Sequence, residues 1–411
     1  MKFYIILLAI ILGTASCKKN SDPPPATSKD LQLPAEAGTV INSSNTAAFK
    51  IFNKVLSSEE NANTLVSPLS IYMALGMVYN GAENATRDSI GKVLEIEGNG
   101  VDNLNATAKA LIEQLPGEDN KVTMSIANSI WYKKNDVQPI QSFLDICNEN
   151  FKATISALDF SSPSALTTIN NWVSDKTKGK IPKILESIDD GDLMFLVNAI
   201  YFNGSWKYSF DPANTYNTIF HGAQGHDIST PFMSQEITVS GTSNENFDMV
   251  ELPYGTGKAF SMYIILPKNA SLELNPFVAS LNESILTDAI AQMQESKMKI
   301  IIPKWEYSYD WKSFKDQLKA MGMAIAFTDS ADFSKMYPRK VHITKAVHKT
   351  YIKVNEAGTE AAAATAIGIT FTSAPSQPRE FKADHPFIYI IAEKQTGTIL
   401  FTGTLNDPSK N

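Results

Sequence analysis

Apolar residues recur along the chain at two different spacings, and each spacing predicts a different element. From Thr46 to Leu56 they fall three or four positions apart, which predicts an amphipathic helix. The continuous apolar run from Phe195 to Phe202 has the length of a strand, and it predicts a central strand covered on both faces. Other strand-like segments are 122–132, 250–254, 261–267, 300–309, 350–354, 387–392 and 397–403.

Capping residues indicate two further helices, and a third follows a predicted strand. Ser67 and Pro68 suit the cap and first turn of a helix that follows a short strand. A second helix includes Ile169 and is ended by Gly179. A third is expected over 311–321. This mixture of helices and strands fits one large mixed domain, although the length of 411 residues would also allow two or three domains.

The segment from Glu356 to Thr372 fits neither spacing. Gly358 and Gly368 are typical of a loop, yet residues 359–370 contain no proline and only one large polar side chain. With a two-residue period, one face would carry only small or β-branched uncharged side chains, namely Thr359, Ala361, Ala363, Thr365, Ile367 and Ile369. The segment could therefore enter a sheet as a strand. An alanine-rich surface helix or linker is the alternative.

Composition excludes several classes of protein. The net charge of −7 and the pI near 5.4 argue against nucleic acid as a partner. Two cysteines, Cys17 and Cys147, cannot form a disulfide framework, and Cys147 is expected to be a packed thiol. No segment of the mature chain is apolar over the length that spans a bilayer.

The N-terminus has the pattern of an export signal. Lys2 precedes a short apolar run, and small residues then lead to Cys17. This resembles a bacterial lipoprotein signal, with residues 1–16 removed and Cys17 lipidated, although Thr14 stands where leucine is usual. Residues 17–40, with their three consecutive prolines, would then tether the domain to the outer membrane, on its periplasmic face or at the cell surface. A plain signal peptide and secretion are the alternative.

Motifs for catalysis or cofactor binding are missing from the sequence. The histidines do not form H-E-x-x-H or pair with cysteine at zinc spacing, and neither a G-x-S-x-G elbow nor a phosphate loop is present. His221 and His226 could bind a metal weakly, but an exposed loop pair is favoured. We therefore expect no cofactor, no metal site and no catalytic residues, and a hydrolase is the weakest interpretation.

Two motifs resemble those of a known protein family. Residues 356–365, EAGTEAAAAT, resemble the reactive-loop hinge of the serpins, and residues 383–388, ADHPFI, resemble the segment after that loop. Further similar blocks follow in order from Thr46 to Pro408. The resemblance implies an α+β fold with a large, mostly antiparallel central sheet, further sheets and eight or nine helices. It implies one metastable, monomeric domain over 41–411, with an exposed reactive loop at about 356–380.

The resemblance also implies roles for individual residues. The hinge would comprise Glu356, Gly358, Thr359, Glu360, Ala361, Ala362, Ala363, Ala364 and Thr365. The region where the central sheet parts would comprise Ser67, Ser70, Asn198, Trp206 and His348. His348 would hydrogen-bond Asn198, and the helix at 169–181 would lie across the sheet and shift when the loop enters.

The implied activity is that of a suicide inhibitor of proteases. A protease would cut the loop and form an acyl-enzyme. The freed loop would then insert into the sheet and trap the attached protease. The expected bond joins Thr372 and Ser373, within a window from Phe371 to Ala374. Small or aromatic residues there suit elastase-, subtilisin- or chymotrypsin-like serine proteases, with a cysteine protease as a further candidate. The alternative is a non-inhibitory binding or scaffold lipoprotein on the same fold.

Overall fold

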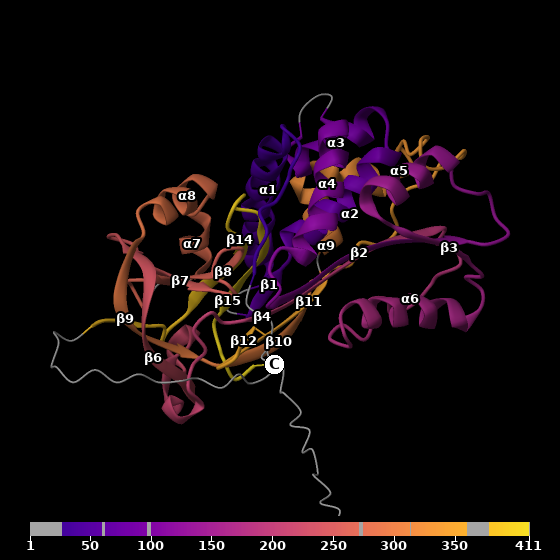
Figure 1. Ribbon diagram of the computed structural model, residues 1–411. Coiled ribbons are helices and arrows are strands. Elements are labelled where there is room, and N and C mark those ends of the chain that lie inside the picture. The colour runs from indigo at the N-terminus through magenta and orange to yellow at the C-terminus, as the bar shows by residue number, and fades with distance from the viewer. Residues whose placement is uncertain are drawn as a thin grey trace, which may run out of the picture.

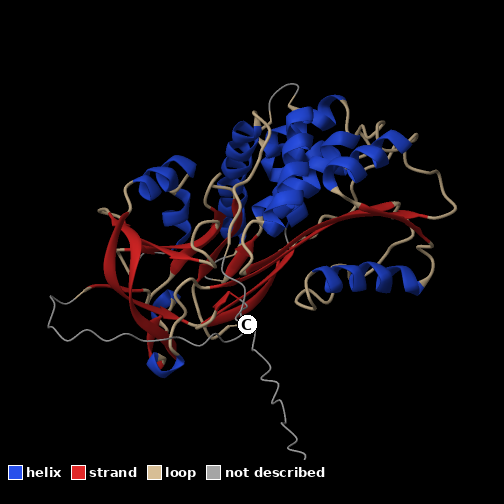
Figure 2. Ribbon diagram, viewed as in Figure 1, coloured by secondary structure: helices blue, strands red, loops and turns tan. Residues whose placement is uncertain are grey.

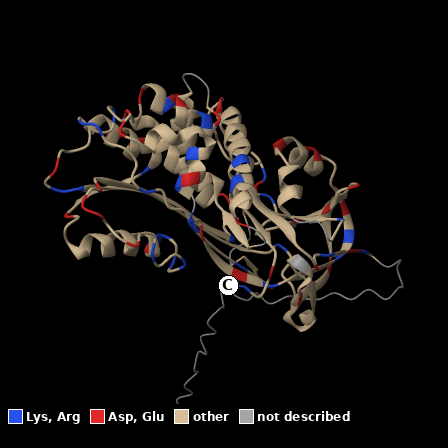
Figure 3. Cartoon of the chain, turned by 180° about the vertical axis from the view of Figure 1, so that it is seen from behind, with Lys and Arg blue, Asp and Glu red and all other residues tan. Residues whose placement is uncertain are grey.

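The computed structural model describes residues 27–59, 62–96, 100–270, 274–312, 314–359 and 378–410 (Figure 1). In this part of the chain, the helices are α1 (Ala37–Ser58), α2 (Pro68–Gly81), α3 (Asn84–Leu94), α4 (Val101–Gln114), α5 (Gln141–Phe151), α6 (Pro163–Lys176), α7 (Leu274–Ala279), α8 (Glu283–Ala291) and α9 (Phe314–Leu318). Acidic and basic residues are interspersed along it (Figure 3).

The strands form two sheets. The larger, nine-stranded sheet contains β1 (Thr64–Val66), β15 (Ile399–Leu405), β14 (Phe387–Glu393), β8 (Phe260–Pro267), β7 (Phe247–Pro253), β6 (Asp227–Ser243), β9 (Gln294–Pro303) and β13 (Arg379–Lys382), in that order, with β5 (Tyr216–His221) paired to β6. The six-stranded sheet contains β10 (Trp305–Asp310), β11 (Lys349–Asn355), β12 (Gly358–Thr359), β4 (Met194–Ser205), β2 (Val122–Lys133) and β3 (Thr154–Leu158), also in spatial order. The predicted α+β class with a mostly antiparallel central sheet is confirmed.

The six-stranded sheet is covered on both faces. Helices α1 to α5 gather on one side, and α6 lies alone against the other side (Figures 1 and 2). Alternate residues of β4 point to the two sides, so Ile200 and Phe202 join the main core while Phe195, Val197 and Ala199 pack in a second core with α6. The prediction of a central strand covered on both faces is confirmed for residues 195–202.

Several predicted boundaries need correction. Ser67 caps α2 as expected. Helix α1 begins nine residues before Thr46, and the sequence pattern missed this start because buried polar side chains such as Asn45 interrupt the apolar face of the helix. The segment 300–309 is two strands rather than one: β9 and β10 belong to different sheets. The helix predicted over 311–321 is short, because Gly322 has a φ of +107° and ends the helical turns that follow α9.

Part of the segment predicted as a tether belongs to the folded domain. Its described part, from residue 27, packs against the domain, and the side chain of Leu31 is buried. The Leu31 backbone N–H donates to the Gln395 side chain at 2.7 Å, and the Lys29 N–H donates to the Glu118 carbonyl at 2.7 Å. Assigning all of residues 17–40 to a flexible tether is therefore wrong for residues 27–40.

Beneath this segment lie two buried carboxyl groups, those of Glu118 and Glu393. The Glu393 carboxylate accepts the Thr396 backbone N–H at 2.9 Å. Burial, followed by the charge of Glu393, raises the pKa of Glu118 to about 9. Glu118 therefore keeps its proton at neutral pH in the folded protein and releases it on unfolding.

We expect Glu118→Gln to stabilise the protein increasingly as the pH rises. Between the unfolded pKa of 4.5 and the folded value of about 9, the native state holds a proton that the unfolded state has lost. The free energy of unfolding of the parent should thus fall by up to about 1.4 kcal/mol per pH unit in this window relative to the variant. Urea titrations from pH 5 to 9 measure the difference. Glu113→Gln, at an exposed carboxyl of α4, is the control and should show no such trend; equal pH profiles for Glu118→Gln and parent would contradict the assignment.

Candidate functional site: the hinge and the gap beside β4

Two of the predicted hinge residues form a strand of the six-stranded sheet. Gly358 and Thr359 make up β12, which lies between β11 and β4. Thr359 pairs with Val354 on one side and with Gly204 on the other, both antiparallel. The loop therefore leaves the described part of the chain at Thr359, from a position already inside the sheet.

An aromatic cluster forms the seat of the hinge. Thr359 is buried, and its hydroxyl oxygen lies 2.5 Å from the hydroxyl oxygen of Tyr254. The Tyr254 ring stacks on Trp206, with centroids 4.5 Å apart and planes 13° apart. The Trp206 indole N–H donates to the Asn355 carbonyl at 3.0 Å. This cluster leaves room for a small side chain at residue 359.

Backbone geometry explains why residue 358, next to Thr359, is a glycine. Gly358 has a φ of +149°, and a Cβ there would lie 2.1 Å from the Gly204 carbonyl oxygen. Only glycine can therefore sit between the two flanking strands at this point.

Just before β12, the Glu356 carboxylate holds the hinge from the side. It accepts hydrogen bonds from Lys304 Nζ at 3.0 Å and from Thr215 Oγ1 at 2.9 Å. Burial alone would raise the pKa of Glu356, but a hydrogen bond to its own backbone, these two side-chain hydrogen bonds and the Lys304 charge outweigh burial and lower it. The start of the loop is thus fixed by an ion pair as well as by the β12 ladder.

In the described part of the chain, no strand fills the sheet beyond β12. Among the described residues, β4 and β11 share no ladder of their own and are joined only through β12. A cavity of about 350 Å³ lies next to this gap. Its lining is largely apolar and comes from β4, from residues 340–349 and from the helices behind them, including Leu75, Val78, Leu196, Phe314, Leu318 and Phe327.

Polar residues beside the gap form two separate sets. Asn198 donates from Nδ2 to Asn128 Oδ1 at 2.7 Å and accepts a hydrogen bond from the Ser70 hydroxyl. His348 accepts the Ser67 backbone N–H at Nε2, at 3.1 Å. The predicted hydrogen bond between His348 and Asn198 is therefore wrong for this structure, because the gap between β4 and the start of β11 separates them.

Burial decides the charge of His348. It lowers the pKa of the imidazole to about 4, only partly opposed by the charge of Asp310. The ring is therefore neutral at physiological pH, which is what an acceptor of the Ser67 N–H requires.

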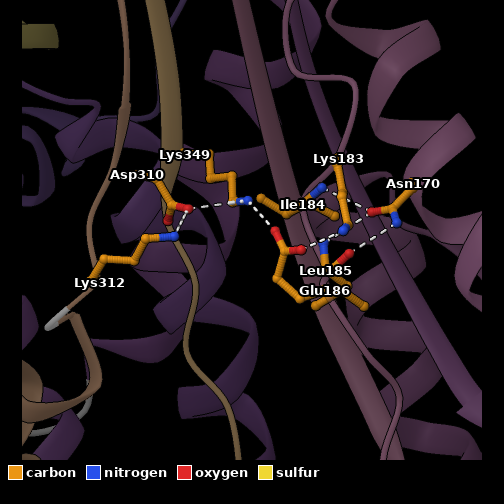
Figure 4. Close-up of polar contacts among 8 residues, drawn as sticks. All are labelled: Asn170, Lys183, Ile184, Leu185, Glu186, Asp310, Lys312 and Lys349. Atoms are coloured by element: carbon orange, nitrogen blue, oxygen red, sulfur yellow. Dashed lines mark hydrogen bonds and ion pairs between the residues drawn. The ribbon is translucent and has the colours of Figure 1, made fainter.

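On the other side of the sheet, the segment after α6 is tied to β11 (Figure 4). Asn170 of α6 orders this segment, because its Oδ1 accepts the backbone N–H groups of Ile184 at 2.8 Å and Leu185 at 2.9 Å. Glu186 then contacts Lys349 Nζ at 3.1 Å, and Lys349 also lies 3.2 Å from Asp310. Helix α6 packs against β2 and β4 on this face, and it begins at Pro163, earlier than residue 169.

Several predicted residues lie outside the described part of the chain: Cys17, Glu360, Ala361, Ala362, Ala363, Ala364, Thr365, Phe371, Thr372, Ser373 and Ala374. Sequence reasoning missed Tyr254 and Lys304, because each contacts the hinge from a distant segment. The alternating pattern before Tyr254 placed it on a strand but not against Thr359. Among the described residues, no three His, Cys, Asp or Glu side chains gather to hold a metal ion. No described helix is both long and apolar enough to cross a membrane.

Comparisons with known proteins agree with this architecture. The family model described as serpin (serine protease inhibitor) matches residues 42–408. An uncharacterized serpin-like protein of Thermococcus kodakarensis is 32% identical over 390 residues, which cover 93% of this chain and 89% of that protein.

Two solved structures are similar over nearly the whole chain. The thermophilic serpin tengpin in its native state has a TM-score of 0.82 at 32% identity, with 93% of this chain and 96% of that chain covered. Human thyroxine-binding globulin has a TM-score of 0.81 at 25% identity, with 91% and 100% covered. The chain therefore belongs to the serpin family, whose members are mostly protease inhibitors.

Proposed function

We propose that the protein inhibits proteases as a suicide substrate whose cleaved loop fills the gap beside β4. The observation that carries this proposal is the hinge strand β12, which already lies between β4 and β11, two strands that no other described strand joins. Attack on the loop gives an acyl-enzyme, and cleavage releases the loop to extend β12 as a full strand. About a dozen inserted residues at ~3.3 Å each would carry the bound protease roughly 40 Å.

The register of β12 indicates where each loop residue goes. Thr359 lies opposite Gly204, and in an antiparallel pair each step forward on the loop is one step back on β4. Ile367 would therefore lie opposite Leu196, and Ile369 opposite Met194. Directly opposed residues share a face, so both isoleucines would point toward the cavity that Leu196 and Met194 line.

This placement supplies a driving force for insertion. Burying an isoleucine side chain contributes about 1.5–3 kcal/mol, and each ladder hydrogen bond contributes roughly 0.5–1.5 kcal/mol. Filling an apolar cavity removes a further cost of about 24 cal/mol per Å³. The uninserted protein is therefore metastable in this proposal.

The target is a serine protease with a small or aromatic specificity pocket, and a cysteine protease is the second candidate. Thr372 precedes the expected bond to Ser373, and Phe371 and Ala374 bound the window. The protein is exported, and a lipid on Cys17 anchors it to the bacterial outer membrane; secretion after cleavage of a plain signal peptide is the alternative. It acts as a monomer.

The test mixes the mature chain, with Cys17→Ser to prevent lipidation, with elastase-, subtilisin-, chymotrypsin-, trypsin- and papain-like enzymes. We expect a complex that survives denaturing electrophoresis and a released peptide that begins near Ser373, located by intact mass. Clean cleavage with no complex and no gain in thermal stability would reject the proposal. A binding or scaffold role would then be favoured, since thyroxine-binding globulin combines a similar fold with a bound small molecule.

The cavity-filling role of the isoleucines gives a separate prediction. We expect Ile369→Asp to lose most of the gain in melting temperature that loop cleavage gives the parent protein, because a carboxylate would be buried in the apolar cavity. Differential scanning fluorimetry before and after cleavage measures the gain. The control is Gln377→Asp, beyond the expected bond, which should keep the full gain. An undiminished gain in Ile369→Asp would show that the register differs.

A further inference from the structure

A second set of contacts bridges the gap at its far end, away from the hinge. Lys345 Nζ lies 2.8 Å from Asp192 Oδ2 and 2.8 Å from Asp189 Oδ2, and it donates to the Ser187 carbonyl at 3.0 Å. The Thr344 hydroxyl donates to Asp192 Oδ1 at 2.8 Å. Lys345 and Thr344 precede β11, whereas Asp192 precedes β4, so these contacts join the two sides of the gap directly.

Burial and charge make these contacts stronger than ordinary surface pairs. The Asp192 side chain is only 2% exposed, and its Oδ2 also accepts the Asp189 backbone N–H at 2.8 Å. Burial would lower the pKa of Lys345, but its bonds to Asp189 and Asp192 outweigh burial and raise it. Breaking such a pair leaves an uncompensated buried charge, which is costly.

The register places these contacts on the path of the loop. Extended along β4 from Thr359 opposite Gly204, the inserted strand brings Phe371 opposite Asp192. Extended along the other side from Thr359 opposite Val354, it brings residues 368 and 369 beside Lys345 and Thr344. A strand between them would hold Lys345 and Asp192 about 9.5 Å apart across the sheet and roughly 10 Å along it, too far for an ion pair.

We propose that Lys345, Thr344 and Asp192 form a clasp that opposes the last third of loop insertion, at residues 368–371. The clasp does not contact the first residues that insert after β12, and it opposes insertion only where residues 368–371 would lie. The uncut loop is thereby kept from filling the sheet. This inference rests on the proposed function, because it concerns the same path of insertion.

Two synthetic peptides separate the clasp from general loosening of the sheet. One peptide has the sequence of residues 359–372 and must open the clasp, and the other has residues 359–366 and ends before it. Each is incubated with the mature Cys17→Ser chain without protease, and its uptake is followed by native electrophoresis and by the rise in melting temperature. The variants are Lys345→Met and Asp192→Asn, both close in shape to the parent residue.

We expect each variant to take up the long peptide about tenfold faster or more, with the short peptide unaffected. High salt should accelerate uptake of the long peptide by the parent protein but not by Lys345→Met, because salt weakens the ion pair that only the parent contains. The matched control is Lys353→Met, on β11 itself, whose ion pair with Glu306 reaches β10 and does not cross the gap. It should behave as the parent.

The outcomes separate this inference from the proposed function. Parent-like uptake of the long peptide by both variants would overturn the clasp alone, as would equal acceleration of both peptides. A parent protein that never takes up the long peptide would mean that the gap accepts no strand, and the proposed mechanism would fail with it.

Discussion

Replacing Thr359 by arginine should convert the protein from an inhibitor into a substrate. Thr359 is 3% exposed and lies against Tyr254, which stacks on Trp206. A guanidinium in this seat would be desolvated among aromatic rings. Arginine would disrupt β12, the strand from which insertion continues, so insertion would be slow and the acyl-enzyme would be hydrolysed before the protease is displaced.

The measurement is the fraction of protease recovered as a covalent complex after denaturing electrophoresis. We expect this fraction to fall by about tenfold or more, while the rate of loop cleavage stays close to that of the parent. Glu360→Arg is the matched control, because in an extended strand residue 360 points to the opposite face from residue 359. A full yield of complex from Thr359→Arg would refute insertion as the trapping step.

The local patterns of the sequence were sufficient for elements whose signals lie within a few residues. Ser67 and Pro68 marked the start of α2 because a cap and a first-turn proline are local requirements. The apolar run of β4 marked a strand packed on both sides. The hinge motif marked where the loop begins, and the structure places Gly358 and Thr359 inside the sheet.

Features that depend on distant segments were not predictable in this way. The seat of the hinge joins Thr359 to Tyr254, 105 residues away, and nothing local to either residue signals the contact. The break at Lys304 separates two strands of similar pattern, and its backbone N–H donates to the Pro231 carbonyl on β6, in the nine-stranded sheet that β9 also belongs to. Such features are set by tertiary packing, which overrides local propensity.

The prediction of a His348–Asn198 hydrogen bond was wrong for a related reason. It requires the start of β11 to lie beside β4, whereas the structure leaves a gap there. Ser67 takes the position of partner to His348, through its backbone N–H. The resemblance drew attention to these residues, but the pairing among them depends on contacts with distant segments.

Acidification from pH 7 to pH 4 should destabilise the protein through His348. Its folded pKa of about 4 lies below the ordinary value of 6.5, so on falling pH the unfolded state takes up a proton that the native state does not. The stability present above pH 6.5 is therefore lost progressively down to about pH 4, by up to roughly 3 kcal/mol. The free energy of unfolding from urea titrations at each pH measures this loss.

Protonation should also promote opening of the sheet. A charged imidazole cannot accept the Ser67 N–H, so the hydrogen bond between the residue before β11 and the N-cap of α2 would be replaced by a repulsive contact. We expect the protein to take up the peptide of residues 359–372 faster at pH 4.5 than at pH 7. His348→Gln, whose amide oxygen can accept the same N–H at either pH, serves as the control. The two proteins differ in one titrating group, so the difference between their pH profiles isolates His348 from the carboxyl groups that titrate in the same range. Parallel profiles would mean that His348 does not control the sheet.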